Sequence, residues 1–213
     1  MYPQYNIPTK RLLPFALAIV GAVFLHTTSS TPYATADSPP AMATGGDASI
    51  NKWAEYTPEG KMKRPPFSFR KWVYVGTPLT PNDLNDGKAN FPEFHNVYID
   101  PDSFSHLEKT GEYRDGTVIV KELVSVGAKE ASSGNGYFQG DFIGLEVSVK
   151  DAKRYPTDPG NWGYYSFGHS YPLKEQSAKN RTDECNGCHQ RHAVNFVFSQ
   201  YYPVLRAALP AKK

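Results

Sequence analysis

The fold is decided by the stretch TVIVKELVSV, residues 117–126, which is bounded by glycine on both sides. β-Branched residues dominate the stretch, as is typical of a strand inside a β-sheet. Because side chains alternate between the two faces of a strand, each apolar face of this strand carries one charge. Lys121 is the charge on one face, and Glu122 is the charge on the other.

A second long strand is expected at Tyr137–Asp151, after the turn-forming segment GNG at 134–136. One face of this strand is apolar, with Ile143, Leu145, Val147 and Val149. The other face carries Glu146 between Gly144 and Ser148, so the alternation predicts a half-buried strand. Because its neighbours on this face are small, Glu146 is either exposed to solvent or next to a space that a ligand could occupy.

Three further strands are expected at residues 71–76, 94–99 and 162–167. A helix should follow Asp100, which can cap its N-terminus before Pro101, and it should end at Gly111. From residue 183 to the end of the domain the pattern is again helical. The predicted fold class is α+β: an antiparallel β-sheet of about five strands with an inserted helix and a C-terminal helix that carries the two cysteines.

The N-terminal part of the chain has the pattern of an export signal. Lys10 and Arg11 precede the apolar run 12–25, and Ala-Thr-Ala at 34–36 offers a cleavage site. The 14 residues of the apolar run are fewer than the roughly 20 that span a bilayer, which favours a signal peptide over a membrane anchor. We predict a signal peptide at 1–36 and a periplasmic protein with no membrane span after its removal.

The remaining chain is expected to have two parts. Residues 37–66 are rich in small and polar residues, as is typical of a flexible arm, and residues 67–213 form the folded domain. Removing Lys10 and Arg11 reduces the 23 basic residues to 21, which equals the 21 acidic residues. This balance gives no electrostatic reason to expect binding to nucleic acid or to an anionic membrane.

Residues 185–189 read CNGCH, a pattern typical of covalent haem attachment. Cys185 and Cys188 can each add to a haem vinyl group, and His189 can ligate the iron. A local disulfide, a redox-active thiol pair and half of a zinc site are alternatives, although zinc would need two further ligands and the chain has only these two cysteines. None of the 24 residues after His189 is Met, so we expect one haem c per chain with an open sixth coordination position.

Three further residues are candidates for chemistry. A lysine on an apolar strand face must snorkel, pair or lose its proton, so Lys121 is either a structural lysine or a desolvated, nucleophilic amine. Glu146 is either a solvated carboxylate or part of a ligand pocket. His95 is a surface or core histidine unless it titrates near neutral pH and takes part in proton transfer. Glu122 is expected to be paired structurally.

Several motifs, in this order, resemble the cytochrome P-460 family. They are RKWVYVGT at 70–77, LNDGK at 84–88, DGT at 115–117, KEL at 121–123, GNGYF at 134–138, and the haem motif followed by residues 198–207. The resemblance extends over residues 67–208, nearly the whole predicted domain. It implies a homodimeric, sheet-rich periplasmic cytochrome whose haem has a third covalent bond, from the nitrogen of Lys121 to a porphyrin meso carbon.

The resemblance also implies a function. Members of the family oxidise hydroxylamine to nitrous oxide or nitrogen oxides and pass the electrons to other cytochromes. Glu146 matches a distal carboxylate that transfers protons, and His95 stands where some relatives carry arginine. The resemblance therefore predicts a haem-dependent oxidoreductase, with hydroxylamine and nitric oxide as its small ligands and a cytochrome as its electron acceptor.

Two other functions compete with this prediction. A nitric-oxide-binding cytochrome of the c-prime-beta type is similar in its sheet fold but lacks the lysine bond, and its distal pocket is typically apolar. The charged residues Lys121 and Glu146 argue against that reading. Simple electron transfer is weakened by the missing methionine.

Overall fold

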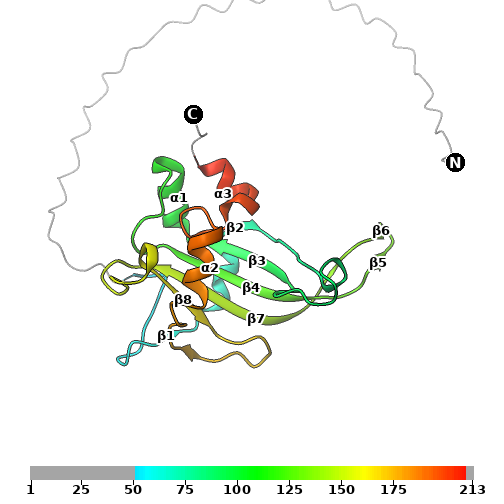
Figure 1. Ribbon diagram of the computed structural model, residues 1–213, viewed down its shortest axis with the longest axis horizontal. Coiled ribbons are helices and arrows are strands. Elements are labelled where there is room, and N and C mark those ends of the chain that lie inside the picture. Colours follow the sequence, from blue (N-terminus) through cyan, green and yellow to red (C-terminus); the bar gives the residue numbers. More distant parts are fainter. Residues whose placement is uncertain (1–50, 210–213) are drawn as a thin grey trace, which may run out of the picture. The chain divides into compact units, whose positions relative to one another are not determined.

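The structure is a computed structural model, and it describes residues 51–209 (Figure 1). Its main feature is a five-stranded antiparallel sheet, which confirms the predicted α+β class. In spatial order the strands are β2 (Val73–Gly76), β3 (Phe94–Ile99), β4 (Val118–Val126), β7 (Gln139–Lys150) and β8 (Trp162–Ser166). The spatial order follows the chain order, so the two longest strands, β4 and β7, lie side by side near the middle of the sheet.

The inserted helix α1 (Pro101–Thr110) lies between β3 and β4 in the chain, as predicted. The carboxylate of Asp100 accepts hydrogen bonds from the backbone N–H of Ser103 at 2.9 Å and from that of Val118 at 2.8 Å. One buried side chain therefore caps the helix and joins its start to β4. Gly111 ends the helix with a φ of 76°, a conformation that favours glycine.

Shorter elements complete this part of the chain. β5 (Glu130–Ala131) pairs with β6 (Gly134–Asn135), so a small hairpin extends from the β4–β7 end of the sheet (Figure 1). Single 3₁₀ turns are formed by Phe67–Lys71, Asn82–Leu84, Pro159–Asn161 and Ser199–Tyr201.

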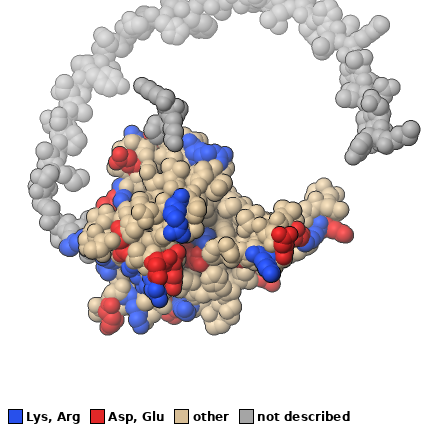
Figure 2. All heavy atoms as spheres, in the orientation of Figure 1, with Lys and Arg blue, Asp and Glu red and all other residues tan. Residues whose placement is uncertain are grey.

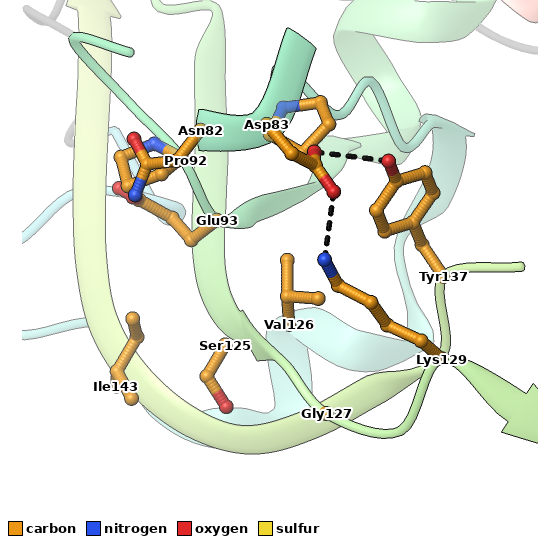
Figure 3. Close-up of a pocket in the computed structure, with 11 residues that line it drawn as sticks. Asn82, Asp83, Pro92, Glu93, Ser125, Val126, Gly127, Lys129, Tyr137 and Ile143 are labelled. Atoms are coloured by element: carbon orange, nitrogen blue, oxygen red, sulfur yellow. Dashed lines mark hydrogen bonds and ion pairs between the residues drawn. The ribbon is translucent and has the colours of Figure 1, made fainter. Parts of the chain in front are cut away.

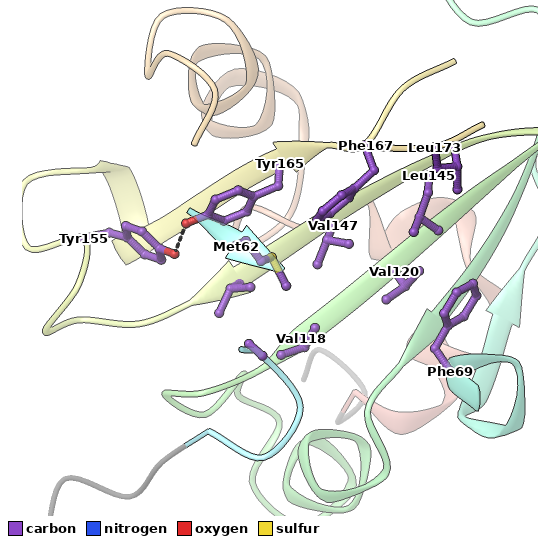
Figure 4. Packing of buried hydrophobic residues seen from close by; sticks show 12 residues of the cluster. Met62, Phe69, Val118, Val120, Leu145, Val147, Tyr155, Tyr165, Phe167 and Leu173 are labelled. Carbon is purple, nitrogen blue, oxygen red and sulfur yellow. Dashed lines mark hydrogen bonds between the residues drawn. The ribbon is translucent and has the colours of Figure 1, made fainter. Parts of the chain in front are cut away.

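One face of the sheet is covered by a hydrophobic core (Figure 4). Its members include Met62, Phe69, Val118, Val120, Leu145, Val147, Tyr165 and Phe167. Glu122 lies on the same face with 1% of its side chain exposed, and its Oε1 is 2.5 Å from Nη2 of Arg70. The sheet thus accommodates the charge on this face by pairing it, as the sequence predicts for Glu122.

The composition indicates a flexible arm at residues 37–66. The structure describes this segment from residue 51, and there it packs onto the domain. β1 (Met62–Lys63) pairs with β9 (Gln176–Ser177), and both Ala54 and Met62 are buried in the core of Figure 4. This segment packs more closely against the core than its composition indicates. A short strand and two apolar side chains suffice to attach a polar segment to a core.

The opposite face of the sheet carries the C-terminal elements. The predicted helical region consists of two short helices, α2 (Cys185–His192) and α3 (Pro203–Ala208), with irregular chain and the 3₁₀ turn at Ser199–Tyr201 between them. A second core beneath them includes Val75, Val97, Ile99, Ile119, Trp162, Tyr164 and Leu205. Asn186 attaches α2 to β8, because its side-chain amide donates to the carbonyl of Trp162 at 2.7 Å.

The predicted signal peptide at 1–36, and residues 37–50 of the predicted arm, lie outside the described residues. Among residues 51–209, no helix combines the length and the hydrophobicity that crossing a membrane requires.

Candidate functional site

The haem-attachment motif forms the first turns of α2. Cys185 opens the helix and Cys188 follows one turn later, so both thiols lie on neighbouring positions of the same short helix. Neither cysteine is in a disulfide; the Cys185 side chain is half-buried and that of Cys188 is exposed. Asn180 donates to Sγ of Cys185 at 3.3 Å. The helix therefore offers two free thiols at the spacing that the two vinyl groups of a haem require.

The ring of His189 is held with one nitrogen free. Its Nδ1 lies 2.8 Å from the carbonyl oxygen of Phe196. A carbonyl only accepts hydrogen bonds, so Nδ1 carries the proton and Nε2 keeps its lone pair. The ring lies between those of Tyr164 and Phe198, with centroid distances of 4.4 and 4.7 Å, and burial lowers its pKa. A neutral, oriented imidazole with a free Nε2 is the form that ligates a metal.

Lys121 and Glu146 are opposite each other on β4 and β7, on the sheet face that carries α2. The Lys121 Nζ is 2.5 Å from Oε2 of Glu146, and each side chain is 24% exposed. Lys121 is thus paired on a central strand, and the pairing was not predictable from either strand alone. Its Nζ also lies 4.7 Å from the ring centroid of Phe91.

The pKa of Glu146 depends on the neighbouring Lys121. Burial by itself raises the pKa of Glu146, but the ammonium group of Lys121, with smaller contributions from His169 and His95, lowers the pKa below its ordinary value overall. A free Lys121 amine therefore keeps Glu146 ionised.

His95 lies on β3, on the same sheet face, where it pairs with Leu123 of β4. Its side chain is 13% exposed, and its Nε2 is buried with no hydrogen-bond partner among the described residues. Burial, followed by the positive charge of Lys121, lowers the pKa of His95 to about 4. Of the alternatives that the sequence leaves open for His95, this burial supports a histidine that stays neutral in the folded chain, and a part for His95 in proton transfer stays a prediction.

Two residues of the site were not predicted from the sequence. His169 follows β8, and its Nε2 lies 3.1 Å from Oε1 of Glu146. Phe91 precedes β3 and contacts both Lys121 and the ring of His95, 5.8 Å away between centroids. Both lie in loops, where strand alternation predicts nothing about direction. The only signal for His169 was a polar side chain immediately after a predicted strand that could neighbour Glu146.

The helix and the sheet residues belong to one site. The ring of His189 lies 4.4 Å from that of Tyr164, and Cys185 packs against the core on the sheet face that bears Lys121 and Glu146, so α2 lies over that face. The first cause of the raised pKa of Cys185 is burial. Two free thiols and one free imidazole nitrogen on α2 fit a covalently held haem, and Nε2 of His95 is a polar group on the same sheet face without a partner among the described residues.

Two hollows lie elsewhere. The larger, of about 440 Å³, lies between the 3₁₀ turn at Asn82–Leu84 and the start of the small hairpin, where Asp83 accepts hydrogen bonds from Lys129 and Tyr137 (Figure 3). Its wall includes Glu93, whose Oε1 is 3.9 Å from Nε2 of His95. The second hollow, of about 270 Å³, is lined in part by Trp162 and Phe196. On the molecular face drawn in Figure 2, positive and negative side chains are interspersed.

The model of the family described as Cytochrome P460 matches residues 66–199, which include both strands of the Lys121–Glu146 pair and the whole haem-attachment motif. No curated protein matches the chain.

Proposed function

The chain belongs to the Cytochrome P460 family and is therefore a haem c cytochrome, and from this premise we propose that it oxidises hydroxylamine. The observation that carries the proposal is the ion pair of Lys121 and Glu146, 2.5 Å apart on the sheet face beneath α2. A charged pair of this kind suits acid–base chemistry on a polar substrate better than the apolar capture of a gas.

In this proposal Cys185 and Cys188 hold the haem through thioether bonds, and Nε2 of His189 ligates the iron. When bound, the haem supplies an iron centre that binds hydroxylamine and takes up its electrons. The hydrogen bond from Nδ1 of His189 to Phe196 fixes the direction of the ligating nitrogen. The flanking rings of Tyr164 and Phe198 restrict rotation of the imidazole.

Lys121 is proposed to form the third haem bond, from its nitrogen to a meso carbon. A lysine nitrogen that is bonded to a conjugated ring is no longer an ammonium ion, because its lone pair is shared with the ring. Glu146 then loses the positive charge that contributes most to lowering its pKa, and the effect of burial, which raises the pKa, dominates. The bond to Lys121 would thereby raise the pKa of Glu146 and convert it from the partner of an ion pair into a stronger proton acceptor.

Glu146 is proposed to accept the protons that hydroxylamine loses as its electrons leave. Oε2, which contacts the Lys121 nitrogen, is the oxygen closest to the proposed haem bond. A general base must lie within about 3 Å of the proton that it removes, directly or through one water. His95 is proposed to hydrogen-bond the substrate through Nε2, and the lowered pKa of the ring and the lack of a partner for Nε2 among the described residues support this role.

The cellular setting belongs to the same proposal. The signal pattern at 1–36 supports a periplasmic protein, the compartment in which haem c is attached. A cytochrome would take the electrons, and family resemblance supports a homodimer. Nitric oxide would bind at the same iron.

Two variants of the purified holoprotein test the proposal, with hydroxylamine turnover measured under excess oxidant. Glu146→Gln should retain the haem and its spectrum but lose at least about 100-fold in kcat, because the base is removed. Lys121→Ala should give an ordinary c-type spectrum and lose the covalent bond that survives chemical cleavage of both thioethers. Glu108→Gln on the exposed side of α1 and Lys109→Ala are matched controls that should behave as the wild type.

Three results would contradict the proposal. Full turnover by Glu146→Gln would remove the carboxylate from the mechanism. An altered spectrum that persists in Lys121→Ala would reject the lysine bond. A wild-type protein that has an ordinary c-type spectrum, binds nitric oxide and does not turn over hydroxylamine would instead support the c-prime-beta type of gas-binding cytochrome.

A further inference from the structure

The two oxygens of the Glu146 carboxylate face different partners. Oε2 is 2.5 Å from the nitrogen of Lys121, and Oε1 is 3.1 Å from Nε2 of His169. The side chain of His169 is 51% exposed, whereas that of Glu146 is 24% exposed. Lys121, Glu146 and His169 therefore form a row that leads from the sheet interior to solvent.

Backbone geometry brings His169 to this position. The chain leaves β8 through Gly168, whose φ of 119° favours glycine, and the carbonyl of Gly168 accepts a hydrogen bond from the N–H of Leu145 at 3.1 Å. A Cβ on Gly144 would lie 2.7 Å from that carbonyl and 3.2 Å from Cα of His169. The absence of a side chain at Gly144 is thus what lets the loop approach Glu146 closely.

We propose that His169 is a proton relay between Glu146 and solvent, an inference that rests on the function proposed above. The proton on Oε1 of Glu146 moves to Nε2 of the neutral His169 ring, and the ring then releases its Nδ1 proton to water. Exchange with solvent moves the remaining proton from Nε2 back to Nδ1, which restores the tautomer that accepts the next proton. The step transfers protons only, so no oxidant or reductant takes part. The carboxylate is regenerated for the next proton from the substrate.

The other groups around Glu146 are poorly placed for this transfer. His95 on β3 is buried, and its nearest carboxylate is Glu93 at 3.9 Å. Lys121 on β4 is committed to the proposed haem bond, and Cys185 on α2 to a thioether. His169 is the group at proton-transfer distance from Glu146 that is also half exposed to water.

The test compares His169→Gln with the wild type as holoproteins over a range of buffer concentrations. In dilute buffer the variant should lose about tenfold in kcat with an unchanged KM, since the substrate site is intact but proton exit is slowed. Added imidazole or concentrated buffer should restore turnover. His106→Gln on α1 is the control and should behave as the wild type at every buffer concentration.

A second readout does not depend on turnover. In protein labelled with ¹³C-glutamate, the pKa of Glu146 should shift in His169→Gln, because the ring whose Nε2 lies 3.1 Å from Oε1 is removed. Gly144→Ala, which displaces the loop without altering the imidazole, should reproduce both the buffer-dependent defect and the shift in the pKa of Glu146.

The outcomes separate this inference from the proposed function. The relay would be overturned if His169→Gln keeps the wild-type kcat in dilute buffer and leaves the pKa of Glu146 unchanged. The proposed function would still stand in that case, provided that Glu146→Gln is inactive. A defect in His169→Gln that imidazole and concentrated buffer fail to restore would also overturn it, because the role would then be structural. If Glu146→Gln keeps full turnover, the proposed function itself fails.

Discussion

At the scale of single residues, the site combines charged and neutral titratable groups on one sheet face. His95 is the most constrained of them, because it is buried beside the cation of Lys121 and its Nε2 has no hydrogen-bond partner within residues 51–209. Such a group is costly to the fold whenever it becomes protonated. The proposed substrate would give the ring a hydrogen-bond partner.

We predict that His95 makes the holoprotein less stable in acid. The pKa of His95 is lowered from 6.5 to about 4, so between these values the unfolded chain binds a proton that the folded chain does not bind. Stability therefore falls as pH falls through this window, by up to about 3 kcal/mol, and this contribution is fully retained above pH 6.5. Denaturant unfolding at pH 7 and pH 4.5 should show a smaller acid loss for His95→Gln than for the wild type.

The control for this prediction is His106→Gln, which leaves the buried histidine in place and should keep the wild-type dependence on pH. Equal acid losses in His95→Gln and the wild type would show that His95 is not the group responsible.

At the scale of elements, β4 shows how one strand carries opposite charges on its two faces. Lys121 pairs across the sheet with Glu146 of β7, whereas Glu122 pairs with Arg70 from the 3₁₀ turn that precedes β2. Arg70 is further held by the rings of Phe67 and Phe142, with its guanidinium carbon 4.9 and 4.1 Å from their centroids. The first pair faces the proposed haem and the second supports the core beneath it.

Arg70→Met should destabilise the fold by about 2 kcal/mol, because it leaves the buried carboxylate of Glu122 without its partner. The double variant Arg70→Met with Glu122→Gln should recover part of this loss, since the uncompensated charge is gone. The measurement is the free energy of unfolding in urea at pH 7. Unchanged stability of the single variant would mean that water or another cation replaces Arg70.

At the scale of the whole domain, the core draws on residues that lie far from one another in the chain. Met62 is fully buried next to side chains of β4 and β7, although it belongs to a segment whose composition is typical of an arm. The segment therefore contributes to the sheet that supports the site on its other face.

We expect Met62→Ala to reduce the free energy of unfolding by about 3 kcal/mol, as is usual when a buried side chain is truncated to leave a cavity. Lys63→Ala is the matched control. The side chain of Lys63, next to Met62 in the chain, is exposed and forms only a surface ion pair with Glu55. Chemical denaturation of both variants measures the difference. Equal stabilities would indicate that the segment is only loosely docked in solution.

The sequence by itself determined the strands, the inserted helix and the haem-attachment motif, because alternation, capping residues and the CNGCH spacing act within a few residues of one another. It also identified Lys121 as a charge on an apolar strand face, and Glu146 as a carboxylate between two small residues on the other face of its strand. Only the tertiary structure decided that these two side chains meet, that Arg70 pairs with Glu122, that burial lowers the pKa of His95 and that His169 reaches Glu146. These contacts depend on strand register and on how closely a loop passes Gly144, and both are set by packing between segments that no local pattern relates.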